Sequence, residues 1–500
     1  MVSVVPLAEP VQTSAAAESL GARVRRAVIW RSGSQLLAQL VQWTATFLVI
    51  RILDPRDYGL FAMTQVILVL LNMLNGYGLA SGLIQQKEIN EREVRQLFGM
   101  LLVLNGGLAL GQVLLAPVAA AYYRQPIIAE MLRVQALLYL TTPFIALPYA
   151  LLSRTMEFRS QAAANICASV ASAAAALAGA LAGLGVWTLV LAPLVLFTVR
   201  AVIMTWTAGT LVWPILDFRG AGRLARFGGV MAAGQMFWFL QSQADVFIAG
   251  RVFSPHLLGI YTTSIFLTQI FVSKFVPPLN EVAFSAYARL HDGDPEALAA
   301  AFNRAVRIVM TAALPFYFGL AVTAEPLVLT VLGAKWMEMV PVVRLLALAM
   351  PCMTLQVLLT PACDARGRPG IGVRNGATGA LLLTAAFLLG VGHGPTGLAW
   401  AWLAAYPLYL AASARRSLPV IGSSFRSVAG AVAPALLAAL AMAAAVALVD
   451  HALPPLEVHV RLAVLVATGA ASYGAWLVLF ARRMVVEIIT TLRPRPTHAD

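Results

Sequence analysis

The chain has 500 residues, of which 60% are hydrophobic and only 11% are charged, and its formal net charge is +13. Soluble domains carry roughly 25% charged residues. This chain therefore has too little polar surface for a water-soluble globule, as its mean hydropathy of +0.81 also indicates. The same composition excludes a disordered chain, a collagen and a disulfide-rich scaffold, and leaves a polytopic membrane protein.

The net positive charge comes almost wholly from arginine, since the only lysines are Lys87, Lys274 and Lys335. In a soluble protein such an excess would indicate a nucleic-acid partner. No basic stretch here forms a separate polar domain, which argues against nucleic acid. Membrane proteins retain cationic loops on the cytoplasmic side, and we expect the charge to have this origin.

Apolar segments long enough to cross a bilayer recur along the whole chain. A helical crossing needs about 20 mainly apolar residues. Fourteen segments are predicted to cross, at residues 30–50, 59–84, 97–121, 128–152, 161–183, 186–211, 228–250, 257–279, 304–323, 340–362, 376–392, 396–412, 428–449 and 460–481. The connections are short, and the longest, 280–303, is predicted to hold a short surface helix that Asp294 caps and Pro295 begins.

The charges of the connections support this count independently. With a cytoplasmic N-terminus, the inner segments hold 25 lysines and arginines and the outer segments hold 6. Every inner connection is positive, as the positive-inside rule requires, and one missed span would invert all later connections. Both termini are therefore predicted to be cytoplasmic.

Two short stretches indicate an internal repeat. Residues 51–61 read RILDPRDYGLF and residues 251–261 read RVFSPHLLGIY, so an arginine, a proline and a glycine recur at an offset of 200. Each repeat would contain six spans, and an even number keeps both copies in the same orientation, related by an axis along the membrane normal. A shared turn composition is the alternative explanation of the match.

We therefore predict an all-α polytopic membrane protein with 14 transmembrane helices. Two six-helix lobes would be related by a pseudo-two-fold axis along the membrane normal, with two further helices at the C-terminus. The predicted parts are a disordered cytoplasmic tail, an N-lobe, a C-lobe, the last two spans and a second cytoplasmic tail, at residues 1–27, 28–213, 214–416, 417–484 and 485–500.

Polar side chains form a stripe on the first predicted span. Arg31, Gln35, Gln39 and Gln42 follow one another at steps of four, four and three, which places them on one helical face. The second span adds Asn72, and the seventh adds Gln235 and Asp245. A single glutamine or asparagine in a span often only joins helices. A stripe of three below an arginine instead favours a face that meets water or substrate.

The charges inside the predicted spans are mainly positive. Arg31, Arg200 and Lys274 lie within spans or at their inner ends, and Asp245 is the one clear acid in the middle of a span. A charge at the bilayer centre needs a partner or a wet cavity. A cationic path suits an anionic cargo such as a phosphate or diphosphate. Snorkelling of arginines to headgroups is the alternative, and Asp245 could also be a counter-ion for one of them.

Motifs for catalysis or cofactor binding are weak or missing in the sequence. The glycine-rich GRPGIG at 367–372 follows no predicted strand, so we interpret it as a turn. The histidines and cysteines show no metal-ligand spacing. No nucleophile–base pair, Walker loop or paired carboxylate appears. We expect no enzyme activity, no cofactor and no metal site.

The chain resembles a known family between about Arg31 and Arg426. The stretches that carry the resemblance are WRSGSQL at 30–36, RILDPRDYGLF at 51–61, SGLIQQKEINEREV at 81–94, YYRQPIIAEMLRVQAL at 122–137, RTMEFRSQA at 154–162, GVWTLV at 185–190, ADVFIAGRVFSPHLLGIY at 244–261, VAFSAYARLHDGDPEAL at 282–298 and AEPLVLTVLGAKW at 324–336. In this order and spacing they resemble a Wzx-type lipid-linked oligosaccharide flippase. That family is the polysaccharide-transporter branch of the multidrug/oligosaccharidyl-lipid/polysaccharide exporter superfamily.

The resemblance implies a transporter in the bacterial inner membrane, surrounded by membrane lipids. It would move undecaprenyl-diphosphate-linked oligosaccharide repeat units from the cytoplasmic to the periplasmic leaflet by alternating access. The product would be exopolysaccharide, capsule or O-antigen. A proton or sodium ion would be the coupling ion, and a polysaccharide polymerase and a chain-length regulator would be partners.

The resemblance also suggests roles for the polar residues. Arg31 and Lys274, with Arg200, would attract the diphosphate, whereas Gln35, Gln39, Gln42 and Asn72 would contact sugar hydroxyls. Gln235 would line the same cavity. Asp245 would couple an ion or hold the cavity together.

Three other functions remain open at this point. A multidrug exporter of the same superfamily would need an acidic cavity, and a peptidoglycan-precursor flippase would share both the architecture and the cationic path. A membrane-embedded polysaccharide polymerase or ligase would belong to a different class. Such enzymes usually present catalytic residues on a sizeable extramembrane loop, and every predicted loop here is short.

Overall fold

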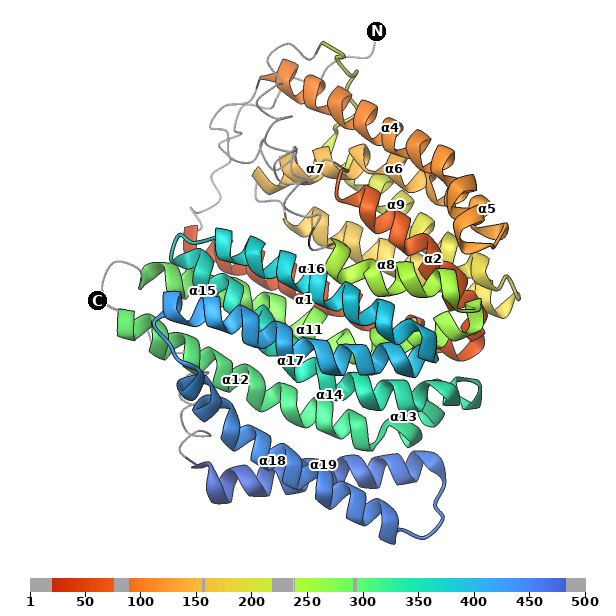
Figure 1. Ribbon diagram of the computed structural model, residues 1–500. Coiled ribbons are helices and arrows are strands. Elements are labelled where there is room, and N and C mark those ends of the chain that lie inside the picture. The colour runs from red at the N-terminus through yellow and green to blue at the C-terminus, as the bar shows by residue number, and fades with distance from the viewer. Residues whose placement is uncertain are drawn as a thin grey trace.

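The computed structural model describes residues 20–75, 90–154, 158–217, 237, 239–290 and 295–482. Every regular element within these ranges is a helix, and Figure 1 shows the long helices packed beside one another. Ten helical stretches in this part of the chain are long and apolar enough to cross a membrane. The chain is therefore an all-helical, multi-pass membrane protein, and the count of fourteen crossings stays a prediction.

Residues 20–217, which we call the N-terminal half, form eight helices in their described part. These are α1 (Leu20–Ile52), α2 (Pro55–Asn72), α4 (Glu91–Tyr123), α5 (Ile127–Gln135), α6 (Leu137–Thr141), α7 (Pro143–Arg154), α8 (Phe158–Leu181) and α9 (Val186–Ala208). Helix α1 begins at Leu20, whereas the sequence prediction places residues up to 27 in a disordered tail. Arginine is a good helix former, so Arg23, Arg25 and Arg26 do not interrupt the helix.

Residues 237–421, which we call the C-terminal half, continue with a helical segment at 239–252. It is followed by α11 (Pro255–Arg289), α12 (Pro295–Val322), α13 (Ala324–Val331), η1 (Ala334–Met339), α14 (Val340–Val357), α15 (Leu359–Ala365), α16 (Gly370–Gly390), η2 (Val391–His393) and α17 (Gly394–Ile421). Helices α18 (Phe425–Ala452) and α19 (Val458–Phe480) end the described chain.

The prediction of a short surface helix within 280–303 is correct in its start at Pro295 but wrong in its length, because that helix continues as α12 to Val322. Helix α11 also runs on into this connection, as far as Arg289. Residues 280–289 contain no glycine or proline, so nothing in them stops the helix. With 35 residues, α11 is about 52 Å long, which exceeds the roughly 30 Å hydrocarbon core. Asp294, the predicted cap, lies outside the described residues.

The apolar stretch from Gly370 to Ile421 folds back on itself as two helices. Helices α16 and α17 pack against each other along their length (Figure 1). The reversal occurs at η2 and at Gly394, whose φ of +74° favours glycine. A Cβ added at Gly397 would overlap the carbonyl oxygen of Gly390. The glycines therefore allow the close approach that the two predicted spans, 376–392 and 396–412, require.

The two halves share one buried core. Helix α1 packs on α8 and α8 on α9, α14 and α16 pack on α17, and α18 joins α12 to α19. Helix α2 of the N-terminal half packs against α11 of the C-terminal half. The largest buried cluster accordingly contains Met63 and Tyr123 from one half and Ala249 and Tyr261 from the other.

Candidate functional site

The polar stripe of α1 lies on the opposite side of the helix from its exposed leucines. Leu37 and Leu40 are 51% and 58% exposed, whereas Gln39 and Gln42 are half-buried. Helical spacing places these two glutamines in phase with Val49, which is buried further along the helix. The described glutamines therefore do not share the face that the leucines offer to lipid. Arg31 and Gln35 belong to α1, but their side chains lie outside the described part.

The contact between α2 and α11 is tight at one end. A Cβ added at Gly59 would overlap the carbonyl oxygen of Pro255, and one added at Gly259 would overlap that of Pro55. The first turns of the two helices thus touch backbone to backbone. One turn further along α2, Met63 is fully buried.

The faces that form this contact become more exposed toward the C-terminal ends of the two helices. On the face of α11 that carries Gly259, Thr263 and Leu267 are 3% and 7% exposed, but Lys274 is exposed. On the matching face of α2, Met63 is fully buried and Leu70 is half-buried. Leu74, which is 43% exposed, lies two residues beyond the end of α2, next to the buried Asn75. The two halves therefore touch at Gly59 and Gly259, and the α11 face of that contact becomes exposed toward Lys274.

The remaining predicted site residues lie in different surroundings. Asn72, the last residue of α2, is exposed and lies on the other side of that helix from Gly59. Arg200 is half-buried on α9. Gln235 lies outside the described residues. Of the predicted set, Lys274 is the residue that helical spacing puts in phase with Gly259 on α11.

Asp245 is buried inside the C-terminal half, with 2% of its surface exposed. Its Oδ2 accepts a hydrogen bond of 2.8 Å from the Tyr261 hydroxyl, and its Oδ1 accepts one of 2.8 Å from the backbone N–H of Val246. The Tyr261 hydroxyl in turn accepts from Trp402 Nε1 at 2.9 Å. Burial of a carboxylate is costly unless it is hydrogen-bonded, and these donors offset that cost. No arginine is among its partners in the described chain.

A second chain of hydrogen bonds lies beside the one that runs from Asp245 to Trp402. The Tyr409 hydroxyl accepts from Gln356 Nε2 at 2.9 Å and donates to Gln241 Oε1 at 3.4 Å. Gln241 is one helical turn before Asp245, so both chains start from the same face of the segment 239–252. Together they join this segment to α11, α14 and α17.

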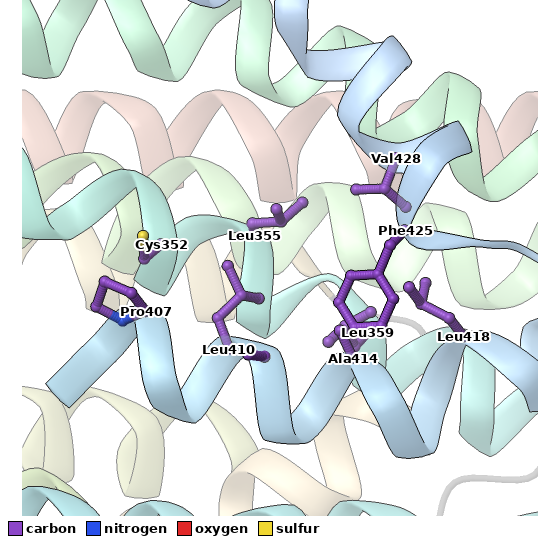
Figure 2. Close-up of a pocket in the computed structure, with 10 residues that line it drawn as sticks. Cys352, Leu355, Leu359, Pro407, Leu410, Ala414, Leu418, Phe425 and Val428 are labelled. Atoms are coloured by element: carbon purple, nitrogen blue, oxygen red, sulfur yellow. The ribbon is translucent and has the colours of Figure 1, made fainter.

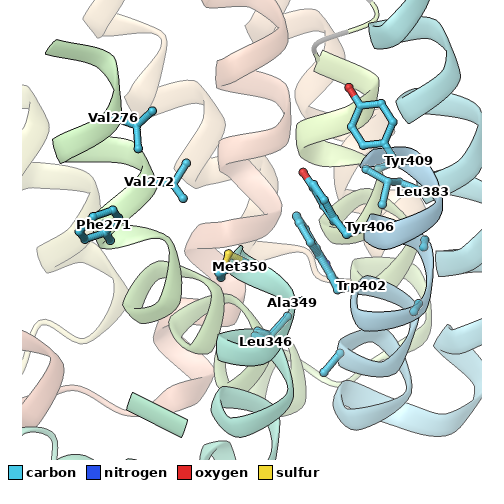
Figure 3. Close-up of a cluster of buried hydrophobic side chains, with 14 of the residues drawn as sticks. Phe271, Val272, Val276, Leu346, Ala349, Met350, Leu383, Trp402, Tyr406 and Tyr409 are labelled. Atoms are coloured by element: carbon cyan, nitrogen blue, oxygen red, sulfur yellow. The ribbon is translucent and has the colours of Figure 1, made fainter. Parts of the chain in front are cut away.

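Three aromatic rings of α17 line this polar cluster. Figure 3 shows Trp402, Tyr406 and Tyr409 following one another along the helix. The rings of Trp402 and Tyr406 stack with centroids 5.0 Å apart, and Tyr406 meets Tyr409 edge-on at 5.8 Å. The sequence prediction missed these rings, although their spacing of four and three already placed them on one face of a predicted span.

An apolar pocket of about 180 Å³ lies between α14, α15, α17 and the start of α18 (Figure 2). Leu355 and Leu359 form one wall, Leu410 and Leu418 of α17 another, and Phe425 covers the end. Its surface is almost entirely hydrocarbon, so it offers no group that would orient a polar ligand. It was not predicted, because its residues are far apart in the sequence.

Residues 48–341, more than half of the chain, match the family described as "Polysaccharide biosynthesis protein". The lipopolysaccharide biosynthesis protein WzxC of Escherichia coli (strain K12) is 25% identical over 309 residues, 61% of this chain and 62% of WzxC. The succinoglycan biosynthesis transport protein ExoT of Rhizobium meliloti (strain 1021) is 25% identical over 336 residues, 66% of this chain and 68% of ExoT. The chain thus spans 62–68% of the length of these two relatives.

Among solved structures, the lipid II flippase MurJ in an inward closed conformation superposes with a TM-score of 0.75. The match covers 91% of this chain and 100% of that one at 11% identity, so it shows a shared fold. The family match contains the whole repeated motif at 51–61 and 251–261 and the segment with Asp245. The resemblance seen in the sequence is confirmed: this chain belongs to the polysaccharide biosynthesis protein family.

Proposed function

We propose that the protein is a flippase that moves undecaprenyl-diphosphate-linked oligosaccharide repeat units across the bacterial inner membrane. The cargo would pass from the cytoplasmic to the periplasmic leaflet for exopolysaccharide, capsule or O-antigen synthesis. Membership of the family supports the pathway, and the names of WzxC and ExoT support the role, since the latter is called a transport protein. The protein would act as a transporter and not as an enzyme.

The observation that carries the proposal is the shape of the contact between the halves. The faces of α2 and α11 are buried at Gly59 and Gly259, and α11 becomes exposed at Lys274, as does Leu74 just beyond the end of α2. A passage that is sealed at one end and open at the other is what alternating access requires of one of its states. With fourteen spans, two six-helix lobes and cytoplasmic termini, the open end would face the cytoplasm.

The cargo's parts would meet different surfaces in this passage. The diphosphate would be attracted by Lys274 and Arg31, and also by Arg200. The glycan hydroxyls would contact Gln35, Gln39, Gln42 and Gln235, whereas Asn72, on the other side of α2 from Gly59, would contact the glycan only outside the α2–α11 face. Lys274, where the α11 face becomes exposed, and the glutamines on the less exposed side of α1 support this arrangement. Asp245, with its partners inside the C-terminal half, would hold that half together or bind the coupling proton or sodium ion.

The charges assigned to the diphosphate give the first testable prediction. Replacing Arg31 and Lys274 together by alanine should lower export at least tenfold, because a hydrogen bond to a charged group contributes about 1.5–3 kcal/mol and about 1.4 kcal/mol is a factor of ten. Export is measured as surface polysaccharide per cell, at equal protein levels. Lys274→Arg, which keeps the charge, and Arg159→Ala, which removes an exposed cation of α8, are the controls. Normal export by the double variant would contradict these roles.

A deletion strain tests the function itself. Loss of a flippase should leave lipid-linked repeat units on the cytoplasmic leaflet, out of reach of a membrane-impermeant glycan-oxidising reagent added to spheroplasts. Single units that react from outside would instead identify a polymerase or ligase. Accumulation of peptidoglycan precursors, or sensitivity to cationic drugs with normal polysaccharide, would favour the other two transporters.

A further inference from the structure

The two copies of the repeated motif face each other where the halves meet. Pro55 and Pro255 each occupy the first turn of a helix, α2 and α11. Gly59 lies against the Pro255 carbonyl and Gly259 against the Pro55 carbonyl. The contact is thus reciprocal, and any side chain at either glycine would force the two helices apart.

The arginine of each motif reaches into the opposite half. Arg51 of the N-terminal half donates through Nη1 to the carbonyl oxygen of Thr330, at 2.7 Å. Arg251 of the C-terminal half donates through Nη1 to the carbonyl oxygen of Tyr122. Arg51 and Arg251 occupy the same position in their motifs, so two equivalent hydrogen bonds cross between the halves in opposite directions.

Both accepting carbonyls belong to the last turn of a helix. Thr330 is the penultimate residue of α13, and Tyr122 is the penultimate residue of α4. Carbonyls in a last turn lack an intrahelical donor, and the negative end of the helix dipole favours a cation there. An arginine is therefore well suited to hold either site, and the bond is lost as soon as the helix ends move away.

Further contacts between the halves accompany each of the two arginine hydrogen bonds. Lys335 Nζ donates to the Ile52 carbonyl at 2.6 Å, and Trp336 Nε1 donates to the Ile50 carbonyl at 2.9 Å. On the other side, the Tyr122 ring stacks on Phe247, with ring centroids 4.7 Å apart. The closed end is thus held by two sets of contacts in addition to the glycine contact.

The geometry points to a latch that closes the outer end of the passage, formed by Arg51, Arg251 and the Gly59–Gly259 contact. This inference rests on the proposed transport cycle and names the contacts that must break when the outer end opens. The two arginine bonds release together because the same movement of one half against the other separates both pairs. The arginines would act by positioning the halves and would not bind cargo.

A buried reporter tests the latch without any cargo. Thr263 lies one turn beyond Gly259 on the same face of α11 and is 3% exposed. In a chain whose cysteines at 167, 352 and 363 are replaced by alanine, Thr263→Cys is labelled in intact cells with a membrane-impermeant maleimide. With the latch intact, labelling should be slow. Gly259→Ala, and separately Arg51→Gln with Arg251→Gln, should each raise the labelling rate at least threefold.

Two matched variants control for general loosening. Gly107→Ala adds a methyl group to α4 at a place with no atom within 4 Å, and Arg51→Lys with Arg251→Lys keeps a charged donor. Both should label at the parental rate. Equal rates for the parent, the glutamine pair and Gly259→Ala, at equal protein levels, would overturn the latch. Because labelling needs no sugar export, a failed latch can be told apart from a failed flippase.

Discussion

Asp245 is a carboxylate that depends on a few named donors. Tyr261 and the Val246 N–H satisfy it, and Trp402 orients the Tyr261 hydroxyl through a further hydrogen bond. In a chain of donors of this kind each bond polarises the next. The cost of disturbing it should therefore depend on whether residue 245 carries a charge.

This dependence can be measured with a double-mutant cycle. Tyr261→Phe should lower the free energy of unfolding by about 1.5–3 kcal/mol, the usual contribution of a hydrogen bond to a charged group, but by only about 0.5–1.5 kcal/mol when Asp245→Asn is also present. Equilibrium unfolding in mixed micelles reports both values. An equal loss in both backgrounds would mean that Tyr261 does not serve the carboxylate.

A second test concerns Gly379, which gives room to Tyr409. A Cβ at Gly379 would lie 2.7 Å from Cζ of Tyr409 and 3.0 Å from Oε1 of Gln241. Gly379→Ala should therefore lower the free energy of unfolding by about 1–3 kcal/mol, as overpacking does. Gly430→Ala is the control, since it meets no atom within 4 Å and should be neutral or stabilising by up to about 1 kcal/mol. An equal change in the free energy of unfolding for the two variants would rule out crowding at Gly379.

At the residue scale, the sequence predicts which polar groups enter the membrane but not which side chains they contact. Asp245 was singled out from its type and position alone. Its partner Tyr261, 16 positions away, and Trp402, 141 positions beyond Tyr261, were not, because contacts between different helices leave no local pattern. Lys274 could be assigned to a span, whereas its exposure on α11 depends on how α2 and α11 cross.

Helices α18 and α19 are joined to the rest of the molecule by ions as well as by packing. Arg461 of α19 donates through Nε and Nη2 to Asp450 at 2.7 and 2.9 Å. Its Nη1 also lies 3.7 Å from Glu325 of α13, and Glu325 lies 3.6 Å from Arg344 of α14. The cluster thus ties one end of the C-terminal hairpin to the C-terminal half.

Arg461→Gln should loosen this end of the hairpin. Loss of the paired guanidinium should cost about 1–2 kcal/mol, since its side chain is 29% exposed and the pair is partly screened. Amide hydrogen exchange of the last turn of α18, including Leu453, whose N–H donates to the Val449 carbonyl, should then rise about tenfold. Arg426→Gln, at the other end of α18, should leave that exchange unchanged. Unchanged exchange in Arg461→Gln would show that packing alone holds the hairpin.

Element boundaries follow the sequence well where one apolar run forms one helix. The span predicted at 428–449 lies inside α18, and the one at 460–481 nearly coincides with α19. The span predicted at 128–152 instead divides into α5, α6 and α7. A hydropathy window does not register such breaks, because a single proline such as Pro143, which begins α7, changes the mean of a window of about 20 residues little while it removes a backbone donor.

For the molecule as a whole, the number and direction of the crossings can be tested directly. With fourteen spans and a cytoplasmic N-terminus, Gly392 lies outside and Arg368 inside. In a chain without native cysteines, Gly392→Cys should react with a membrane-impermeant maleimide in intact cells. Arg368→Cys should react only after permeabilisation. The reverse pattern would require an odd change in the number of spans before residue 368.

The arrangement of the two halves could be predicted only in part from the sequence. The repeated motif predicted two related halves but not that the two copies would touch. The bonds from Arg51 to Thr330 and from Arg251 to Tyr122 join residues 279 and 129 positions apart. Such pairs depend on how complete halves dock, which composition and periodicity do not encode.

The glycine contact limits how this protein can change. Where main chain rests on main chain, there is no side chain to exchange, and every substitution at Gly59 or Gly259 only adds atoms. The contact between Gly59 and Gly259 can therefore be kept or lost, but substitutions cannot adjust its strength. Adaptation to a different sugar must then arise in deeper parts of the passage, while this contact stays the same for every cargo.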